Sequence, residues 1–335
     1  MAAKKQGRQS LVFPSAPAIT HTFTIVGPME GKGPLGYRFD TILEDTYYGE
    51  RTWEKTETKV VRETVQHLLQ KANLPPEEVD FILAGDLLDQ IVASNFALRE
   101  LPISFFGLFG ACSTMAEALA LSAILVEGGF GERAIAVSSS HHNTAERQYR
   151  FPTELGTQRS PTAQWTVTGT GAALVCAGGQ GPHITGATIG KVIDMGAKDP
   201  NDMGSAMAPA AADTIVRHFQ DFNRSPDYYD LIVTGDLGKV GLSILHTLLQ
   251  QQKVDPGPRL SDCGLMIYRP DQDVHAGGSG CGCSAVVFCG HLYKELLEGK
   301  NRRLLLVGTG ALLSPLTYQQ NESIPAIAHA VAIEV

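Results

Sequence analysis

A cysteine stands at the start of an apolar segment in Gly110-Ala111-Cys112-Ser113-Thr114-Met115. The first turn of a helix presents unpaired backbone N–H groups and a partial positive charge, which favour the thiolate that attacks a thioester. Glycine-flanked helix starts are also places where ligands meet backbone amides. The pattern therefore predicts an acyl-carrying nucleophile or a ligand contact at Cys112, although many free cysteines are only small buried hydrophobes.

The elements around this cysteine follow from the hydrophobic pattern. Residues 114–126 are apolar on nearly every face, which predicts a helix that is buried all round and ends at Gly128-Gly129. Ala134–Val137 is short, apolar and partly β-branched, which indicates a buried strand. The cysteine is thus expected to lie on a strand–helix–strand unit.

The same unit occurs twice in the chain. Asp80–Leu87 recurs as Asp230–Leu237, and Ala111-Cys112-Ser113 aligns with Gly282-Cys283-Ser284. Each copy predicts a strand, a connection, an apolar helix and another strand. Strands that alternate with helices indicate a largely parallel sheet with helices on its faces, where ligands collect at the carboxyl ends of strands. We expect halves at residues 1–180 and 181–335, with a long polar connection at 138–168.

Composition excludes several classes of protein. The 335 residues include 27 Lys and Arg against 35 Asp and Glu, which gives a net charge of -8. This charge balance does not indicate the positively charged surface that binds nucleic acid or an anionic membrane. The six cysteines show no disulfide spacing and no second ligand pair for zinc, and no signal peptide precedes them. No apolar run is long enough to span a bilayer. We expect an intracellular protein with reduced thiols, no bound metal and no cofactor.

The duplicated halves, Cys112, and Gly308-Thr309-Gly310 after the last strand of the repeat together resemble the thiolase superfamily, which includes the ketoacyl synthases. The resemblance implies a five-layered α-β-α-β-α fold of two pseudo-symmetric halves, a homodimer, and an acyl group carried on Cys112. It also implies a His or Asn after the strand at residues 231–234 and another ahead of the helix near Cys283. This chain has Asp236 and Ser279 there, and His275 fits only with a slip in register.

Two further segments, Ala145–Gly156 and Pro161–Gly169, closely resemble a family of thiolase-fold sporulation proteins of spore-forming Firmicutes. That resemblance implies a non-enzymatic subunit of the channel complex that moves dipicolinic acid, with calcium, into the developing spore and out on germination. It also implies a peripheral position at the cytoplasmic side of the spore inner membrane, beside membrane subunits. The alternative is an acyltransferase or 3-oxoacyl synthase-like enzyme.

Dipicolinate is a flat ring with two carboxylates, so its pocket should offer cations, backbone N–H groups and an apolar slot. Arg147, Arg150 and Arg159 are candidate clamps, although a solvated loop would also explain each of them. His141 and His142 follow a strand end, and because adjacent histidines cannot both face one site, at most one of these two candidates is expected to contact the ligand. The candidate ligand contacts are therefore Cys112, Ser113, His141, His142, Arg147, Arg150, Asp236, His275 and Ser279.

Two further interpretations concern the acidic and glycine-rich residues. Asp86 and Asp236 end equivalent strands, and as carboxylates they would repel a dianion, which favours a role in capping the next helix over bridging calcium. The stretch His275–Cys283 is dense in glycine and must bring backbone close to a ligand or to another element. We predict that Cys112 and Ser279 share one pocket.

Overall fold

The computed structural model describes residues 4–149 and 159–335, and two halves repeat one order of strands in it. The strands of the first half are β3 (Ala18–Val26), β5 (Phe81–Gly85), β6 (Ser104–Gly107), β7 (Arg133–Ser140) and β9 (Gly169–Cys176). Those of the second are β10 (His183–Thr188), β11 (Leu231–Thr234), β12 (Leu260–Asp262), β14 (Arg303–Ala311) and β15 (Ala326–Glu334). The spatial orders β6-β5-β7-β9-β3 and β12-β11-β14-β15-β10 are the same when each half is numbered along the chain.

Short strands and helices complete the fold. The short strands are β1 (Lys5–Gln6), β2 (Ser10–Val12), β4 (Thr41–Ile42), β8 (Trp165–Thr166) and β13 (Gly278–Ser279). The helices are α1 (Pro28–Gly31), α2 (Trp53–Lys71), α3 (Val92–Leu98), α4 (Thr114–Glu127), α5 (His142–Tyr149), α6 (Met203–Phe222), α7 (Gly238–Gln251), α8 (Cys263–Met266), α9 (Cys281–Val287), α10 (Tyr293–Leu297) and α11 (Pro315–Gln319). The predicted boundary at residue 180 falls between β9 and β10.

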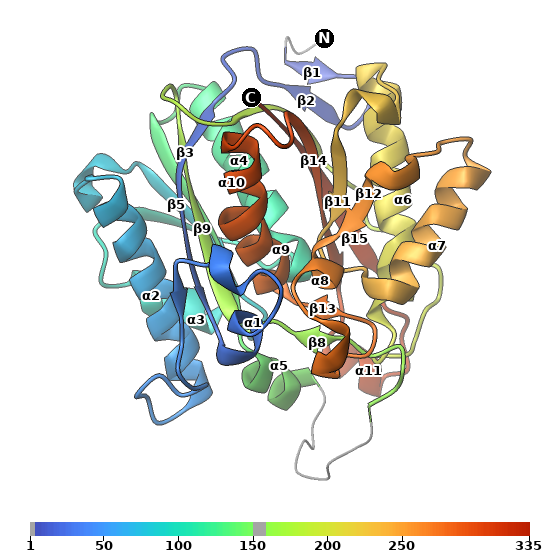
Figure 1. The fold of residues 1–335 in the computed structure, drawn as a ribbon, viewed down its shortest axis with the longest axis horizontal. Helices are drawn as coiled ribbons and strands as arrows, with labels where there is room; N and C mark the ends of the chain where they lie inside the picture. The colour runs from blue at the N-terminus through green and yellow to red at the C-terminus, as the bar shows by residue number, and fades with distance from the viewer. Residues whose placement is uncertain (1–3, 150–158) are drawn as a thin grey trace.

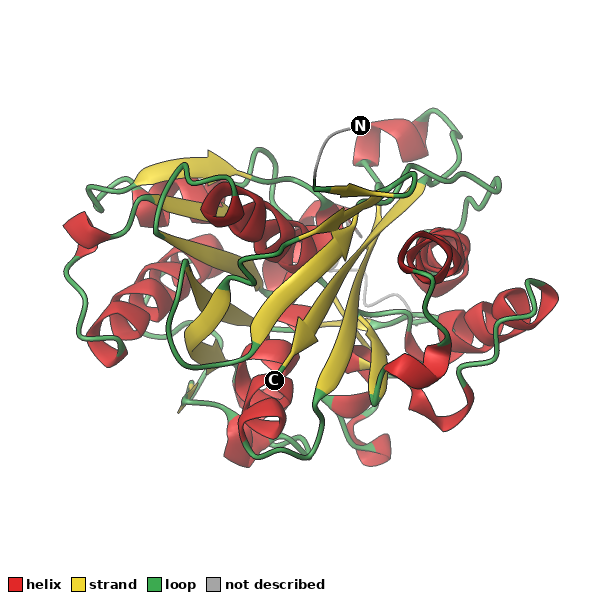
Figure 2. Cartoon of the chain, turned by 90° about the horizontal axis from the view of Figure 1, so that it is seen from above, coloured by secondary structure: helices red, strands yellow, loops and turns green. Residues whose placement is uncertain are grey.

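Five layers result from this arrangement. Figure 1 shows α4, α9 and α10 between the strands of the two halves, with α2 and α3 outside the first half and α6 and α7 outside the second. The view from above also shows helices on both faces of the strands (Figure 2). Helix α4 packs on β7 and on β14, so it joins the halves. None of its residues is exposed, which confirms the predicted helix that is buried all round.

The internal repeat is visible in equivalent hydrogen bonds. The Asp80 carboxylate accepts the backbone N–H groups of Glu132 and Arg133, at 2.7 and 3.0 Å. The Asp230 carboxylate accepts those of residues 302 and 303, at 2.8 and 2.9 Å. In both halves an aspartate therefore fixes the start of two neighbouring parallel strands, β5 with β7 and β11 with β14. The predicted duplication is confirmed.

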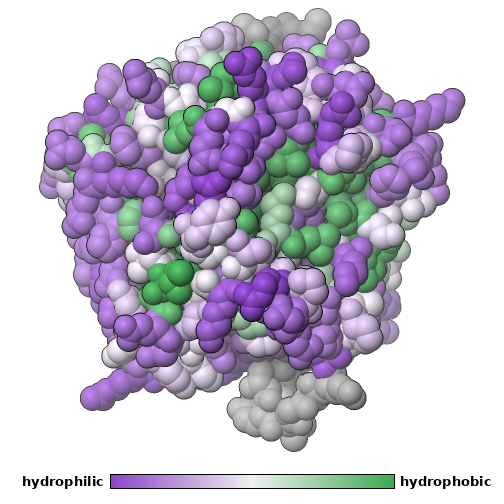
Figure 3. Space-filling model, in the orientation of Figure 1, coloured by the Kyte–Doolittle hydropathy of each residue, from purple (hydrophilic) through white to green (hydrophobic). Residues whose placement is uncertain are grey.

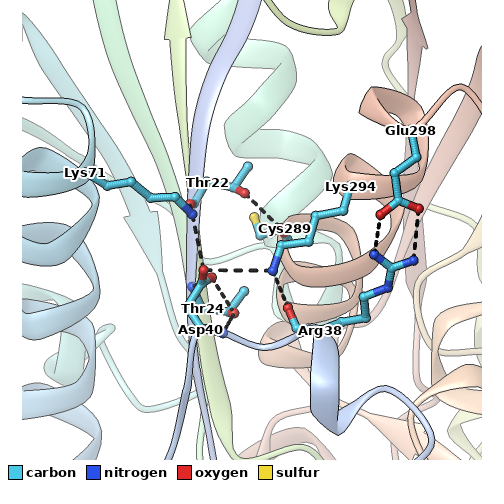
Figure 4. Close-up of polar contacts among 8 residues, drawn as sticks. All are labelled: Thr22, Thr24, Arg38, Asp40, Lys71, Cys289, Lys294 and Glu298. Atoms are coloured by element: carbon cyan, nitrogen blue, oxygen red, sulfur yellow. Dashed lines mark hydrogen bonds and ion pairs between the residues drawn. The ribbon is translucent and has the colours of Figure 1, made fainter.

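Side chains cover the part of the β3 edge that lies between its single pairing with β10, at Ala18, and its short pairing with β4, at Ile25 and Val26. Lys71 Nζ donates to the Thr22 carbonyl at 2.9 Å, and the Asp40 carboxylate accepts the Thr24 N–H at 3.0 Å (Figure 4). Lys71 and Lys294 both lie beside Asp40, at 3.1 and 3.9 Å. These bonds satisfy the free strand edge, so this cluster of cations has a structural role.

The surface gives no sign of a membrane span. Hydrophilic side chains cover most of the face in Figure 3, and apolar ones gather mainly to the right of centre, between α10 and α7. Among residues 4–149 and 159–335, no helix combines the length and the hydropathy that crossing a bilayer requires.

Buried ionisable groups make the stability depend on pH. Burial raises the pKa of Glu30 and Asp262 to about 7 and that of Glu57 to about 8. These carboxyls bind protons in the folded state that the unfolded chain releases, so their contribution to stability falls as the pH rises towards the folded pKa. Burial lowers the pKa of several histidines, most strongly those of His141 (about 4), His218 (about 3) and His329 (about 4).

We therefore expect the free energy of unfolding to change little between about pH 5 and 6.5, because the histidine and carboxyl contributions there have opposite signs. Above the ordinary histidine pKa only the carboxyl contribution remains, and the free energy should fall by about 3 kcal/mol up to pH 8, at about 1.4 kcal/mol per group and pH unit. Urea unfolding at pH 6.5 and at pH 8 measures this decrease in the free energy of unfolding. Glu57→Gln should remove about half of the decrease, and an equal decrease in that variant would contradict the assignment.

Candidate functional site

Cys112 lies in a turn ahead of the buried helix. Residues Ala111–Ser113 form a 3₁₀ turn that leads into α4, and Ala111 has a φ of 51°, which is strained for a residue other than glycine. Cys112 is partly buried, whereas the other five cysteines are buried. Strand β14 approaches this turn closely, since a Cβ at Gly310 would lie 2.6 Å from the Gly110 carbonyl oxygen. Gly308 and Gly310, both in β14, therefore allow the close approach that positions the cysteine turn.

The partner of Cys112 is Asp236, which follows β11. Its carboxylate accepts hydrogen bonds from Ser279 Oγ at 2.9 Å, the Gly280 N–H at 3.0 Å and Thr309 Oγ1 at 2.8 Å. The Cys112 thiol interacts electrostatically with the same carboxylate. Elements from both halves thus converge on one buried acid at the position where the thiolase resemblance implies a His or Asn.

The expected capping role of Asp236 is wrong. The first N–H groups of α7 are taken by Asp262, which accepts those of Leu237 at 2.8 Å and Gly238 at 3.1 Å. A neighbouring strand, β12, supplies that cap, so Asp236 is left to face the cysteine. Asp86 does cap, because its carboxylate accepts the Ser94 N–H in the first turn of α3 at 2.8 Å.

The electrostatics of the site keep the thiol neutral. Burial outweighs the hydrogen-bond donors and raises the pKa of Asp236. Burial and the Asp236 carboxylate together raise the pKa of the Cys112 thiol well above its ordinary value, so the thiol stays protonated at neutral pH. The Gly280 N–H, a possible donor to a substrate oxyanion, is already bonded to Asp236. The arrangement therefore lacks an activated nucleophile.

A cavity of about 260 Å³ opens beside Cys112, and Ser279 also lines it. The prediction that these two residues share one pocket is confirmed. Its walls are mainly apolar and come from both halves: Leu87, Phe109, Ala111, Ala145, Tyr149, Met203, Met207, Ala311, Leu312 and Leu313. Glu146, Thr166, Gly280 and Ser314 complete the lining, so among the described residues no Arg or Lys reaches it.

The structure does not bring the predicted cations to this cavity. Arg147 is exposed and pairs with Glu54, so the prediction that it contacts a ligand in this cavity is wrong. Arg150 lies outside the described residues. Arg159 pairs with Asp273 and stacks over the Trp165 ring. Helical periodicity explains Arg147, because α5 turns Ala145 and Tyr149, four residues apart, towards the cavity and Arg147 away from it.

The predicted histidine contacts also lie elsewhere. His141 is buried, and its Nε2 lies 3.0 Å from the Thr46 carbonyl oxygen. The His142 ring stacks on Trp165, at 3.6 Å between centroids, on the other side of β8. His275 Nδ1 lies 2.7 Å from the Ser160 carbonyl oxygen. Ser113 is buried behind the cysteine, where its Oγ donates to the Gly110 carbonyl oxygen at 2.7 Å. These four assignments to the pocket are therefore wrong.

Sequence reasoning missed several lining residues. Glu146 and Tyr149 lie on α5, within a segment that was expected to be a polar connection. Burial raises the pKa of Tyr149, and its hydroxyl donates to the Leu87 carbonyl oxygen at 2.5 Å. The helical spacing of Ala145 and Tyr149 was the available signal. Within the described part of the chain, no three His, Cys, Asp or Glu side chains lie close enough together to hold a metal ion.

Two comparisons of this sequence with known proteins point to the same family. The sequence model of the stage V sporulation protein AD family matches residues 7–334. A relative of that name from Bacillus subtilis is 50% identical over 331 residues, which cover 99% of this chain and 98% of the relative.

Several solved structures have a fold similar to that of this chain. The 3-oxoacyl-(acyl carrier protein) synthase III of Xanthomonas oryzae has a TM-score of 0.58 at 14% identity, covering 96% of this chain and 100% of that one. The enzyme from Aquifex aeolicus has a TM-score of 0.56 at 13% identity, covering 95% and 100%. An OleA variant of Xanthomonas campestris has a TM-score of 0.56 at 13% identity, covering 98% and 99%. The predicted thiolase-like fold is confirmed.

Proposed function

The chain belongs to the stage V sporulation protein AD family, and from that premise we propose that its cavity beside Cys112 binds dipicolinic acid and does not transfer acyl groups. The observation that carries this proposal is the pairing of Cys112 with Asp236. A buried carboxylate keeps the thiol protonated, yet the cavity beside it is retained. A site that cannot activate its nucleophile is suited to binding.

The ligand is calcium dipicolinate in this proposal. The apolar walls accept a flat pyridine ring, and Ser279 is among the polar residues that line the cavity. The described lining offers no Arg or Lys, and the Asp236 carboxylate is bonded to Ser279 of that lining, so two ligand carboxylates would meet a negative charge there. A calcium ion bound to the ligand offsets that repulsion, and Glu146 is the side chain of the described lining whose oxygens suit such an ion. Equilibrium binding of dipicolinate, with and without calcium, tests the proposal.

The second candidate function is an acyltransferase, because Cys112 opens on an apolar cavity in which an acyl chain would fit. We expect no such activity. After incubation with acyl-CoA at neutral pH, intact-protein mass spectrometry should show less than about a tenth of the chains labelled on Cys112, since the thiolate is scarce. A stoichiometric adduct that disappears in Cys112→Ala would overturn the binding proposal in favour of the enzyme.

A homodimer is the assembly that the sheet edge favours. Strand β6 ends the sheet of the first half, carries no charge, and leaves Phe106 46% exposed, with Phe96 and Phe109 also exposed nearby. An uncharged open edge of this kind pairs readily with another strand, and a second copy of β6 offers the same edge. The proposed dimer pairs the two β6 strands about a twofold axis.

We expect Phe106→Lys to shift the protein at micromolar concentration from twice the mass of one chain to a single chain, as measured by light scattering. The lysine adds a charge to the strand edge, which natural proteins use to prevent pairing. Phe130→Lys is the matched control, because Phe130 is 72% exposed in the turn after α4. A dimer that persists in Phe106→Lys would exclude this edge.

The proposed setting is the spore. In this proposal the protein lies peripherally at the inner membrane, beside membrane-spanning subunits of a channel complex. It presents calcium dipicolinate for uptake during sporulation and for release on germination. Family membership supports this setting.

A further inference from the structure

Helix α4 carries a stripe of side chains that the chain itself covers only in part. Its members share one side of the helix by their spacing, and each is half-buried: Glu117, Leu121, Ile124 and Leu125. The three apolar members pack on the same core cluster as Phe81 of β5. The ring centroids of Phe81 and Phe106 lie 5.7 Å apart, so Phe106 of the β6 edge lies over the face of the sheet that α4 covers. The stripe and the β6 edge therefore form one continuous surface.

Glu117 is the ionisable member of this stripe. Its Oε2 is buried and accepts no hydrogen bond from a described residue. A Cβ at Gly110 would collide with that oxygen, so the carboxyl lies against the chain where it continues from β6 towards α4. Other atoms of the side chain still reach solvent, because the residue is only half-buried. In a single chain the carboxyl group thus lies at the boundary between the core and water.

The charges around α4 do not balance this carboxyl group. Burial alone raises the pKa of Glu117 above its ordinary value. Glu127, at the far end of the helix, is bound to Lys4. The elements that pack on α4 include β5, β7, β9, β10, β14, β15 and α9. Their charged and histidine side chains have partners elsewhere: Arg133 with Glu78, His183 with the Ala16 carbonyl oxygen, Arg303 with the Tyr228 ring, His329 with the Gly190 N–H, and Glu334 with Thr185. Burial raises the pKa of the nearby thiols, which are therefore neutral: Cys112, Cys176, Cys281 and Cys283.

A second copy of the chain is the partner that fits this stripe. Pairing of two β6 strands about a twofold axis continues each sheet into the other copy. The two α4 helices then cover neighbouring parts of the same sheet face, and helices packed side by side in one layer lie about 8–10 Å apart. The half-buried stripe is the side of α4 that remains available for this contact. Association through β6 would therefore cover Glu117 as well as Phe106.

We propose that the α4 stripe is part of the dimer interface and that Glu117 takes up a proton when two copies of this chain associate. The contact removes the remaining water from a carboxyl group that has no cation beside it, and an ionised carboxylate is costly in such surroundings. Protonation avoids that cost. The dimer then binds more protons than two single chains do, so association weakens as the pH rises. This inference rests on the proposed dimer and adds its dependence on pH.

Sedimentation equilibrium at pH 5.5 and at pH 8, at constant ionic strength, measures the dissociation constant of the dimer. We expect this constant to be at least about tenfold larger at pH 8, because up to two protons per dimer are released on dissociation. A dissociation constant that does not change with pH would overturn the role of Glu117 and leave the dimer intact. Protein that remains a single chain at both pH values would overturn the dimer and this inference together.

Two variants assign the pH dependence to one residue. Glu117→Gln keeps the shape of the side chain without its charge, and we expect it to dimerise at pH 8 about as tightly as the native protein does at pH 5.5. Glu322→Gln, which removes an exposed carboxylate from the second half, is the matched control and should keep the native pH dependence. Native pH dependence in Glu117→Gln would contradict the proposal. The comparison of the two pH values is made on the native protein, so it decides the matter even if Glu117→Gln fails to fold.

Discussion

Asp236→Asn is expected to make Cys112 react roughly 10 to 100 times faster with iodoacetamide at neutral pH, because loss of a nearby carboxylate should lower the pKa of the thiol by about one to two units. In the native protein the charge of this carboxylate opposes ionisation of the thiol. Removing the charge lowers the pKa of Cys112 towards its ordinary value. The rate is measured by mass spectrometry of the alkylated peptide.

Two features make this experiment specific. Cys112 is the one cysteine of the six that is not buried, so it should be labelled first in the folded protein. Asp271→Asn, which removes an exposed carboxylate far along the chain from the site, is the control for the change in net charge. An unchanged alkylation rate in Asp236→Asn would mean that Asp236 does not hold the thiol neutral.

Glu146→Gln should weaken binding of calcium dipicolinate about tenfold, the effect of losing about 1.4 kcal/mol of attraction between the carboxylate and the bound calcium. The same change should leave binding of calcium-free dipicolinate unaltered or slightly stronger, because it removes a repulsive charge. Side-by-side titrations with calcium and with a chelator measure both effects. Glu132→Gln, at an exposed position after α4, is the matched control. Equal weakening of both ligand forms would contradict a role for Glu146 in facing calcium.

Much of the fold could be predicted because it repeats in the sequence. The two Gly-Asp strand ends and the two cysteine-bearing helix starts gave the halves, the buried helix α4 and the common pocket of Cys112 and Ser279. These are local patterns of hydrophobicity and turn residues, and the two copies support one another.

The partners of the cysteine were harder to predict. Asp86 and Asp236 occupy equivalent places in sequence, yet only Asp86 caps a helix, because Asp262 from β12 caps α7 instead. The capping of α7 by Asp262 in place of Asp236 depends on a contact between distant segments of the chain, so no local sequence pattern predicts it. The wall formed by α5 was missed for another reason. Its polar residues suggested a loop, and the helical spacing of Ala145 and Tyr149 was outweighed by the turn-rich composition around it.

The absence of Arg and Lys from the described lining changes the expected mode of recognition. The sequence suggested arginine clamps on a dianion, whereas Arg147 is bound to Glu54 and Arg159 to Asp273. The cavity instead combines apolar walls with two acidic residues, Asp236 directly behind it and Glu146 in its lining. A chelate whose charge is balanced by calcium fits these groups better than the free acid does.

Calorimetric titration of the purified protein with equimolar calcium and dipicolinate tests the central claim most directly. The account predicts a saturable heat with one site per chain, which is much reduced when a chelator removes calcium and when Ser279→Trp fills the cavity. No heat at millimolar chelate, from protein that circular dichroism shows to be folded, would contradict it.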